Sequence, residues 1–244
     1  MREMTAILKR ELAGYFATPQ SYVFIVIFLF ATGVFTFNLG GFFESGQADL
    51  RPFFNWHPWL YLFLVPAISM RLWAEERKTG TLEVLMSLPI PVWSMVLGKF
   101  LGAWIFAGVA LALTFPIWIT VNYLGDPDNG VIFASYVGSL LMAGAYLAIG
   151  SCLSAVTSNQ VIAFVVSVTV CFLFLAAGLP LVLDFFSGYA PSGFVQAIAG
   201  LSFLTHFTSI MDGVIRLRDI LFFATLIFVW LSATAVLIDY RRQG

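Results

Sequence analysis

Charge is scarce in this sequence. Only 10% of the 244 residues are Asp, Glu, Lys or Arg, while 60% are hydrophobic and 26 are Phe. A typical soluble domain carries roughly 25% charged residues. The few bases form no groove-sized patch, so nothing in the composition favours nucleic-acid binding. The scarcity of charge excludes an ordinary soluble domain and indicates a polytopic membrane protein.

Cysteine and histidine are also rare. Cys152 and Cys171 both lie in apolar runs, which is typical of small buried thiols and not of a disulfide framework. His57 and His206 have no cysteine, second histidine or carboxylate pair at metal-site spacing. We therefore expect no metal site, and we interpret both histidines as packed or interfacial side chains.

Motifs for nucleotide binding and hydrolysis are absent. The sequence has no G-x-x-x-x-G-K-[ST] P-loop, no G-x-S-x-G nucleophile turn and no H-E-x-x-H zinc helix. The charged start MREMTAILKRELAGYF also differs from the apolar core of a signal peptide. We expect the chain to be no enzyme on its own.

Six apolar runs each approach the ~20 residues that a helix needs to cross the hydrocarbon core. They predict an all-α polytopic membrane protein with spans at about 22–39, 57–73, 96–121, 131–155, 161–183 and 220–238. The segment 184–218 is too apolar for a simple loop, and its run Phe194–Leu204 is too short to cross. We expect an outer re-entrant or interfacial segment there, before the sixth span.

The interiors of the six predicted spans lack acids and bases. Intramembrane charges are kept mainly for ion coupling, relays or gating. Their absence disfavours a proton- or sodium-coupled carrier or a stand-alone channel, and it leaves the bundle with no energy source of its own.

Residues 1–18 predict an interfacial helix. Its apolar residues repeat at helical spacing, and its charged residues Arg2, Glu3, Lys9, Arg10 and Glu11 occupy the other side. With the N-terminus inside, nine of the twelve Lys and Arg residues, Lys99 included, lie on the inner side. This distribution predicts cytoplasmic termini for a single transmembrane domain at 19–244.

Charge is concentrated in one place, the elbow at 74–91 between the second and third spans. We predict a helix to about Lys78, a break at Thr79-Gly80-Thr81 with Thr81 as N-cap, and a short helix Leu82–Leu88 ended by Pro89. Such a short helix is marginal unless its apolar face packs on something. We interpret Leu82, Leu85 and Met86 as that face and as a plug for a groove on a soluble ATPase. The alternative is a solvated loop whose Glu and Arg pair with each other.

Small residues at four-residue spacing occur twice. Gly144, Ala148 and Cys152 lie in the fourth predicted span, and Gly98 and Gly102 open the third. Small residues so placed let another helix approach closely. The spacing leaves open whether that helix belongs to the same chain or to a second copy.

The elbow also resembles a known family. The run 75–83, EERKTGTLE, followed by Leu88-Pro89, resembles the E-E-R-x-x-G-T-x-E-x-L-x-x-x-P pattern of permeases of the type-two ABC exporter family. Three further stretches, 9–19, 22–30 and 206–219, resemble its GldF-like, gliding-motility-associated branch. The chain departs from that branch at Asp212, where a base is expected, and at Arg216, where an acid is expected.

The resemblance implies a permease subunit without cofactors of its own, in the bacterial inner membrane and in contact with its lipid. It implies a homodimer served by two cytoplasmic ATPase subunits that carry ATP and Mg²⁺. Docking on the ATPase would involve the N-terminal helix, with Lys9, Arg10, Glu11 and Phe16, and a coupling helix in the elbow. The elbow residues assigned to this role are Glu75, Glu76, Arg77, Thr79, Gly80, Thr81, Leu82, Glu83, Leu85, Met86, Leu88 and Pro89.

Two functions in the family remain open at this point. The chain is either the permease of an exporter, or an ABC membrane subunit that passes ATPase motion to an extracytoplasmic motility or envelope machine without moving a solute.

Overall fold

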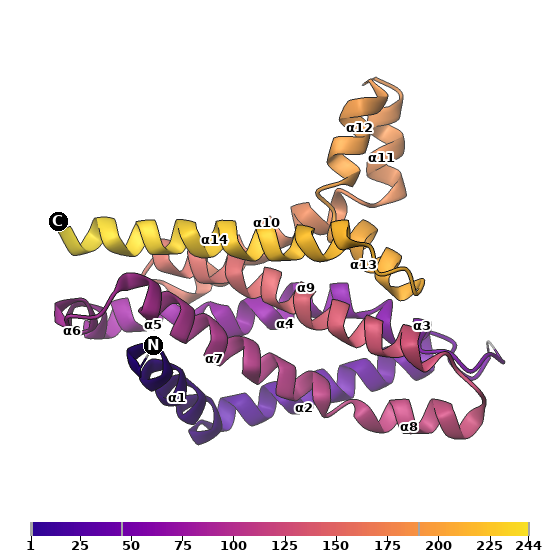
Figure 1. The fold of residues 1–244 in the computed structure, drawn as a ribbon, viewed down its shortest axis with the longest axis horizontal. Coiled ribbons are helices and arrows are strands. Elements are labelled where there is room, and N and C mark those ends of the chain that lie inside the picture. The colour runs from indigo at the N-terminus through magenta and orange to yellow at the C-terminus, as the bar shows by residue number, and fades with distance from the viewer. Residues whose placement is uncertain (1, 45, 190, 244) are drawn as a thin grey trace.

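The computed structural model describes residues 2–44, 46–189 and 191–243, and within them the chain forms helices and no strands (Figure 1). This confirms the all-α class. The side chains of Arg2 and Arg242, counted above among the inner bases, lie outside the described part. The helices are α1 (Arg2–Ala17), α2 (Pro19–Val34) with its π-helical extension η1 (Phe35–Leu39), α3 (Arg51–Phe54), α4 (His57–Ser69), α5 (Arg71–Thr79), α6 (Thr81–Ser87), α7 (Val92–Ala112), α8 (Phe115–Leu124), α9 (Asn129–Val156), α10 (Gln160–Ala176), α11 (Pro180–Ser187), α12 (Ser192–Ala199), α13 (Phe203–Met211) and α14 (Leu217–Gln243).

The helices long and apolar enough to cross a membrane number between four and six in the described residues. Pro19–Leu39, Val92–Leu124, Asn129–Val156 and Leu217–Arg241 qualify individually. Two bent pairs, α10 with α11 at 65° and α12 with α13 at 70°, would bring the total to six if each pair were one span. The predicted second span, 57–73, is instead divided, because α4 ends at Ser69 and α5 starts at Arg71.

Helix α9 lies at the centre of the bundle and packs against α4, α5, α7, α10, α13 and α14. Glycines allow these close approaches. A Cβ on Gly144 would stand 2.9 Å from the indole nitrogen of Trp104, and one on Gly150 would stand 2.6 Å from Cβ of Ser69. Gly144 of the predicted pattern, and Gly150 in the same helix, therefore serve packing within the chain.

Helix α1 crosses α7 at the other pair of small residues. A Cβ on Gly98 would stand 2.8 Å from Cγ2 of Ile7, and one on Gly102 would stand 2.8 Å from Cβ of Glu11. The open question about Gly98 and Gly102 is thus answered by a contact between two helices of the same chain.

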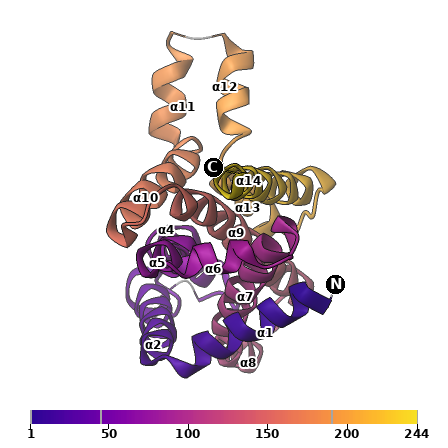
Figure 2. The same cartoon turned by 90° about the vertical axis from the view of Figure 1, so that its left-hand side faces the viewer.

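The two ends of the bundle differ in shape. Figure 1 shows α6, the start of α1 and the end of α14 at one end, which we call the coupling end, and α3 with the α8–α9 connection at the far end. Toward the far end, α11 and α12 project sideways from the bundle as a hairpin (Figure 2). No residue described in these two helices is buried.

The apolar run Phe194–Leu204 of the predicted outer segment is divided between two helices, α12 and α13. The chain breaks at Gly200 and Leu201, and α13 starts anew with Ser202 as N-cap, whose hydroxyl accepts a hydrogen bond from the N–H of Leu204 at 3.1 Å. A capping serine after glycine ends one helix and begins another. Unlike α12, α13 buries a full face, which includes Phe203, His206 and Phe207.

Candidate coupling site

Shortly before the elbow, α4 gives way to α5 at Met70. The first N–H groups of a new helix have no acceptor within it. Here the hydroxyl of Ser154 on α9 accepts from the backbone N–H groups of Trp73 and Ala74 at 3.2 and 3.1 Å, and donates to the carbonyl of Met70 at 2.9 Å. One serine therefore replaces the hydrogen bonds that the break removes, and it ties α5 to α9.

Trp73 fixes the same junction through its side chain. It is fully buried, and its indole N–H donates to the hydroxyl of Ser151 at 3.0 Å. The ammonium of Lys99 lies 5.4 Å from the centroid of its ring, within the range of a cation–π contact. Trp73 thus links α5 to α9 and to α7.

Four charged side chains meet beside Trp73, and we call them the charge cluster: Arg10, Glu11, Glu76 and Lys99. The ammonium of Lys99 lies 3.0 Å from Oε1 of Glu11 and 2.8 Å from Oε1 of Glu76. The guanidinium of Arg10 lies 2.8 and 3.1 Å from the same two oxygens. Two acids and two bases therefore join α1, α5 and α7 with no net charge.

Lys99 is 2% exposed, and a buried ammonium is costly unless it is paired. From the sequence, Lys99 is counted only among the inner bases, although it lies within the predicted third span. A single lysine in an apolar helix was the signal that a carboxylate partner existed. Glu11 is a second correction, because it was expected on the outer polar side of α1 and instead faces α7, with 17% of its side chain exposed.

Burial is the largest single influence on Glu11 and acts to raise the pKa of its carboxyl. The charges and hydrogen bonds of Lys99 and Arg10 together outweigh it, so the pKa lies below the ordinary value. The hydrogen bond from Arg10 to Glu11 likewise raises the pKa of the Arg10 guanidinium against the effect of burial. Both residues are therefore charged at neutral pH.

Arg77 holds the end of α9. Its guanidinium donates to the carbonyl of Val156 at 2.7 Å, and Arg241 on α14 donates to the same oxygen at 3.0 Å. Cations at a helix C-terminus satisfy carbonyls that the helix leaves open. Burial, followed by the charge of Arg241, lowers the pKa of Arg77.

The turn between α5 and α6 is made by Gly80, whose φ of 74° is in the left-handed region that favours glycine. The predicted break is confirmed, but Thr81 is not the N-cap. Gly80 occupies that position, without a side-chain cap, and α6 runs from Thr81 to Ser87. The hydroxyl of Thr81 lies 2.9 Å from that of Thr79, which donates back to the carbonyl of Glu75.

Helix α6 turns its predicted apolar face inward. Leu82 and Leu85 are 4% and 5% exposed and belong to the chain's own hydrophobic core, and Met86 packs against that core. A short amphipathic helix is stable only when this face is covered, and here the chain itself covers it. The face left open carries Glu83 and Val84, with Ser87, Leu88 and Pro89 beyond it.

The remaining predicted residues lie at the same end without joining the charge cluster. Glu75 is exposed and lies 4.0 Å from Arg71, a pair that fits the alternative of a solvated loop. Lys9 is exposed, and the ring of Phe16 meets Phe106 edge-on at 6.0 Å. Glu76 and Arg77 bind other helices, which a solvated loop does not require.

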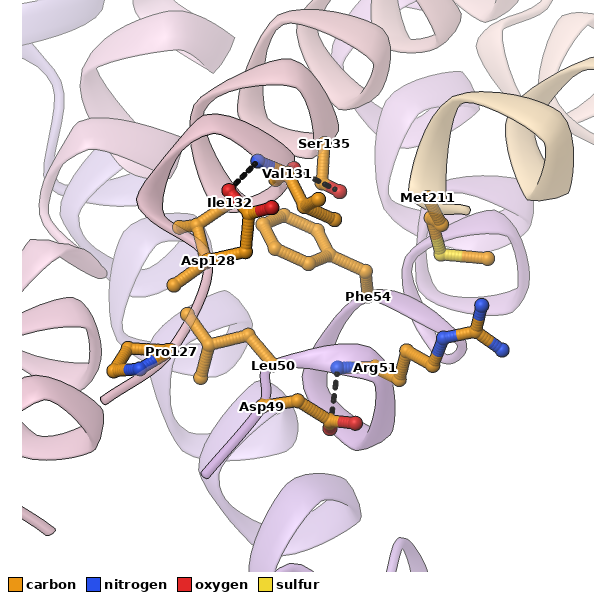
Figure 3. Close-up of a pocket in the computed structure, with 10 residues that line it drawn as sticks. All are labelled: Asp49, Leu50, Arg51, Phe54, Pro127, Asp128, Val131, Ile132, Ser135 and Met211. Carbon is orange, nitrogen blue, oxygen red and sulfur yellow. Dashed lines mark hydrogen bonds between the residues drawn. The ribbon is translucent and has the colours of Figure 1, made fainter. Parts of the chain in front are cut away.

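The far end shows where the two departures from the GldF-like pattern lie. Asp212 forms an ion pair with Arg51. In Figure 3 the guanidinium of Arg51 points away from a small cavity of about 90 Å³, which is lined mainly by apolar side chains such as Leu50, Phe54 and Ile132. Arg216 lies instead in a polar cleft at the base of the hairpin, together with His206.

The fold and the site define a polytopic membrane protein with a charged elbow braced at one end. The sequence model of the ABC-2 family transporter proteins matches residues 60–238, which is more than half of the chain, so the chain belongs to this family. It is a permease of the ABC-2 type. A search of curated proteins returns no match.

Proposed function

We propose that the chain is the membrane subunit of an ABC exporter in the bacterial inner membrane, driven by a separate cytoplasmic ATPase that docks on the elbow at 75–89. The observation that carries this proposal is the open face of α6, which stands on a base braced by three other helices. Family membership supports the same reading, because ABC transporters pair membrane subunits with nucleotide-hydrolysing ones.

The open face has the composition of a protein contact. Val84 is 65% exposed and Leu88 is 42% exposed, beside the exposed carboxylate of Glu83. Apolar side chains with a polar rim, outside the predicted spans, are typical of interaction sites. Because Leu82 and Leu85 face inward, this outer face replaces the apolar plug as the proposed contact with the ATPase.

The contacts of α5 with α1, α7 and α9 would let ATPase docking on α6 move the bundle. A force on α6 passes through Gly80 into α5, which is bound to α9 by Ser154 and Arg77 and to α1 and α7 by Glu76. Buried hydrogen bonds and ion pairs of this kind resist separation, so the helices move together. The elbow therefore serves as a lever on the bundle.

The orientation and the assembly belong to the same proposal. We place both termini and the elbow in the cytoplasm, following the distribution of Lys and Arg. We further propose a homodimer with two ATPase subunits that bind ATP and Mg²⁺, and a place for the chain in the GldF-like branch.

The proposal is tested by a substitution that places one charge on the open face of α6. We expect Val84→Asp to reduce the ATPase that co-purifies with the tagged chain by about tenfold or more, because an unpaired carboxylate at the centre of a contact costs on the order of 2 kcal/mol. The measurements are the amount of co-purified ATPase subunit and the ATP hydrolysis of the complex.

Val161→Asp is the matched control. Val161 is 68% exposed in the first turn of α10, off the elbow, and the same substitution there should leave the pairing unchanged. Leu85→Asp is unsuitable, because Leu85 is buried and its loss would unfold the site. Full ATPase pairing in Val84→Asp would contradict docking on α6.

A second candidate is a membrane subunit that passes ATPase motion to an extracytoplasmic motility or envelope machine. It is supported by the α11–α12 hairpin, where Leu181, Phe185 and Tyr189 are 82%, 65% and 88% exposed. Solute transport by proteoliposomes that contain only this chain and its ATPase would favour the exporter. ATP hydrolysis without solute transport, together with a cellular function that requires an envelope partner, would favour the second candidate.

A further inference from the structure

A polar cleft lies at the base of the α11–α12 hairpin, away from the elbow. It has a volume of about 290 Å³ and is lined by the end of α12, by α13 and by the start of α14, including Gln196, Thr205, His206, Arg216, Arg218 and Asp219. We propose that this cleft binds the phosphate of an anionic phospholipid headgroup. The proposal is independent of the docking of an ATPase on α6.

His206 and Asp219 line the cleft and are paired with each other. Both are buried, and Nδ1 of His206 lies 2.6 Å from Oδ1 of Asp219. Nε2 of His206 lies 3.0 Å from the carbonyl oxygen of Gly200, which can only accept a hydrogen bond. The partner of Asp219 among the described residues is therefore His206 and not either arginine.

The two arginines supply the charge. Among the described residues, neither Arg216 nor Arg218 has an ion-pair partner. One guanidinium nitrogen of Arg218 lies 3.4 Å from where a Cβ on Gly200 would stand, so the glycine leaves room for this side chain. The cleft thus offers two positive charges beside the neutral donors of Gln196 and Thr205, a set that matches a phosphate group.

The position of the cleft relative to the hydrocarbon core favours a lipid headgroup as its ligand. In α14 the apolar run from Ile220 to Ile238 directly follows Asp219. At ~1.5 Å per residue this run is close to the ~30 Å thickness of the hydrocarbon core. Arg218 and Asp219 therefore stand at the boundary where lipid phosphates lie.

Exposed leucines next to the cleft residues in the sequence favour a lipid over free phosphate. Leu201, Leu217 and Leu221 flank the polar residues in the chain and are 54%, 71% and 52% exposed. Exposed leucines next to a phosphate site can contact the acyl chains of a bound lipid, whereas inorganic phosphate has no apolar part that would contact them.

Native mass spectrometry of the full chain purified in detergent tests the proposal. The protein is titrated with phosphatidylglycerol and, separately, with phosphatidylcholine of the same acyl chains. We expect phosphatidylglycerol to bind about tenfold more tightly, and Arg216→Gln combined with Arg218→Gln to remove that preference. Arg216→Lys with Arg218→Lys keeps the charge and should retain most of it.

Arg51→Gln is the matched control, since it removes one arginine at the far end outside the cleft and should leave the preference intact. Equal binding of the two lipids by the unaltered chain would overturn the proposal, as would an equal loss in Arg51→Gln. A third arm titrates inorganic phosphate against bound phosphatidylglycerol. Displacement of the lipid at equal concentration would assign the cleft to free phosphate and overturn the lipid assignment.

Discussion

The coupling end and the far end of the bundle treat charge in opposite ways. At the coupling end, Arg10, Glu11, Glu76 and Lys99 neutralise one another at the contact of three helices. Toward the far end, Arg216 and Arg218 line a cleft, and neither has an ion-pair partner among the described residues. The hairpin beside them, α11 and α12, has no buried residue among those described. Internal pairing holds helices in fixed positions, whereas unpaired charge is available to a ligand. The comparison contrasts an end where charges are paired inside the bundle with an end where two arginines are left open, which is the contrast that the two proposals use.

The largest expected effect is the loss of Lys99. Lys99→Met should lower the free energy of unfolding by about 3–5 kcal/mol, because the carboxylates of Glu11 and Glu76 then lie close together with Arg10 as the one remaining base of the cluster. Denaturant titration in detergent micelles, followed by tryptophan fluorescence, measures it. The triple variant with Glu11→Gln and Glu76→Gln should recover much of the loss, and a change below about 1 kcal/mol in the single variant would contradict a structural role for the cluster.

Removal of the Ser154 hydroxyl comes next. Ser154→Ala should cost about 2–3 kcal/mol, because the N–H groups of Trp73 and Ala74 lose their acceptor in a buried site. The same titration measures it. Ser232→Ala is the matched control, since its hydroxyl donates only to the carbonyl of Phe228 in its own helix, and it should change stability little. Equal effects of the two substitutions would show that Ser154 does not hold the elbow.

A smaller effect is expected where α1 crosses α7. Gly98→Val should weaken the attachment of α1 by about 2 kcal/mol, because its Cβ would stand 2.9 Å from Cβ of Ile7 and 3.2 Å from the carbonyl oxygen of Met4. Faster tryptic cleavage after Lys9 and Arg10 reports the change. Ile7→Ala added to Gly98→Val should slow cleavage again. Gly14→Ala, where no atom lies within 4 Å of the new Cβ, should leave it unaltered.

The smallest effect belongs to the far end. Arg51→Gln breaks the pair with Asp212, whose side chains are 56% and 45% exposed. Such pairs contribute roughly 0–1 kcal/mol and are screened by salt. We expect a change in unfolding free energy of about 0.5 kcal/mol that vanishes at 1 M salt. A salt-independent loss as large as that of Lys99→Met would remove the contrast between the two ends.

Local features of the fold follow from the sequence. The N-terminal helix, the glycine break at Gly80 and the short helix after it depend on propensities and periodicity within a few residues. The sequence also places the elbow residues at one end of the bundle. These predictions succeed because neighbouring residues determine them.

Features that depend on distant segments do not follow from it. The periodicity of α6 shows that Leu82 and Leu85 share a face, yet it cannot say whether the chain or a partner covers that face. A helical wheel of α1 puts Glu11 with the other charges and cannot reveal Lys99, which lies 88 residues further along the chain. The division at Met70 likewise depends on the Ser154 hydroxyl, which is distant in sequence and supplies acceptors that α5 lacks.

The carbonyl of Val156 has a consequence beyond capping. Arg77 from the elbow and Arg241 from the last helix share this one oxygen as their acceptor. If the elbow tilted outward, Arg77 would move away and Arg241 would be left as the donor to this oxygen. If the elbow tilted inward, the positive charges of Arg77 and Arg241 would come closer together. The end of α9 therefore joins the elbow to the last turns of α14 through one shared acceptor.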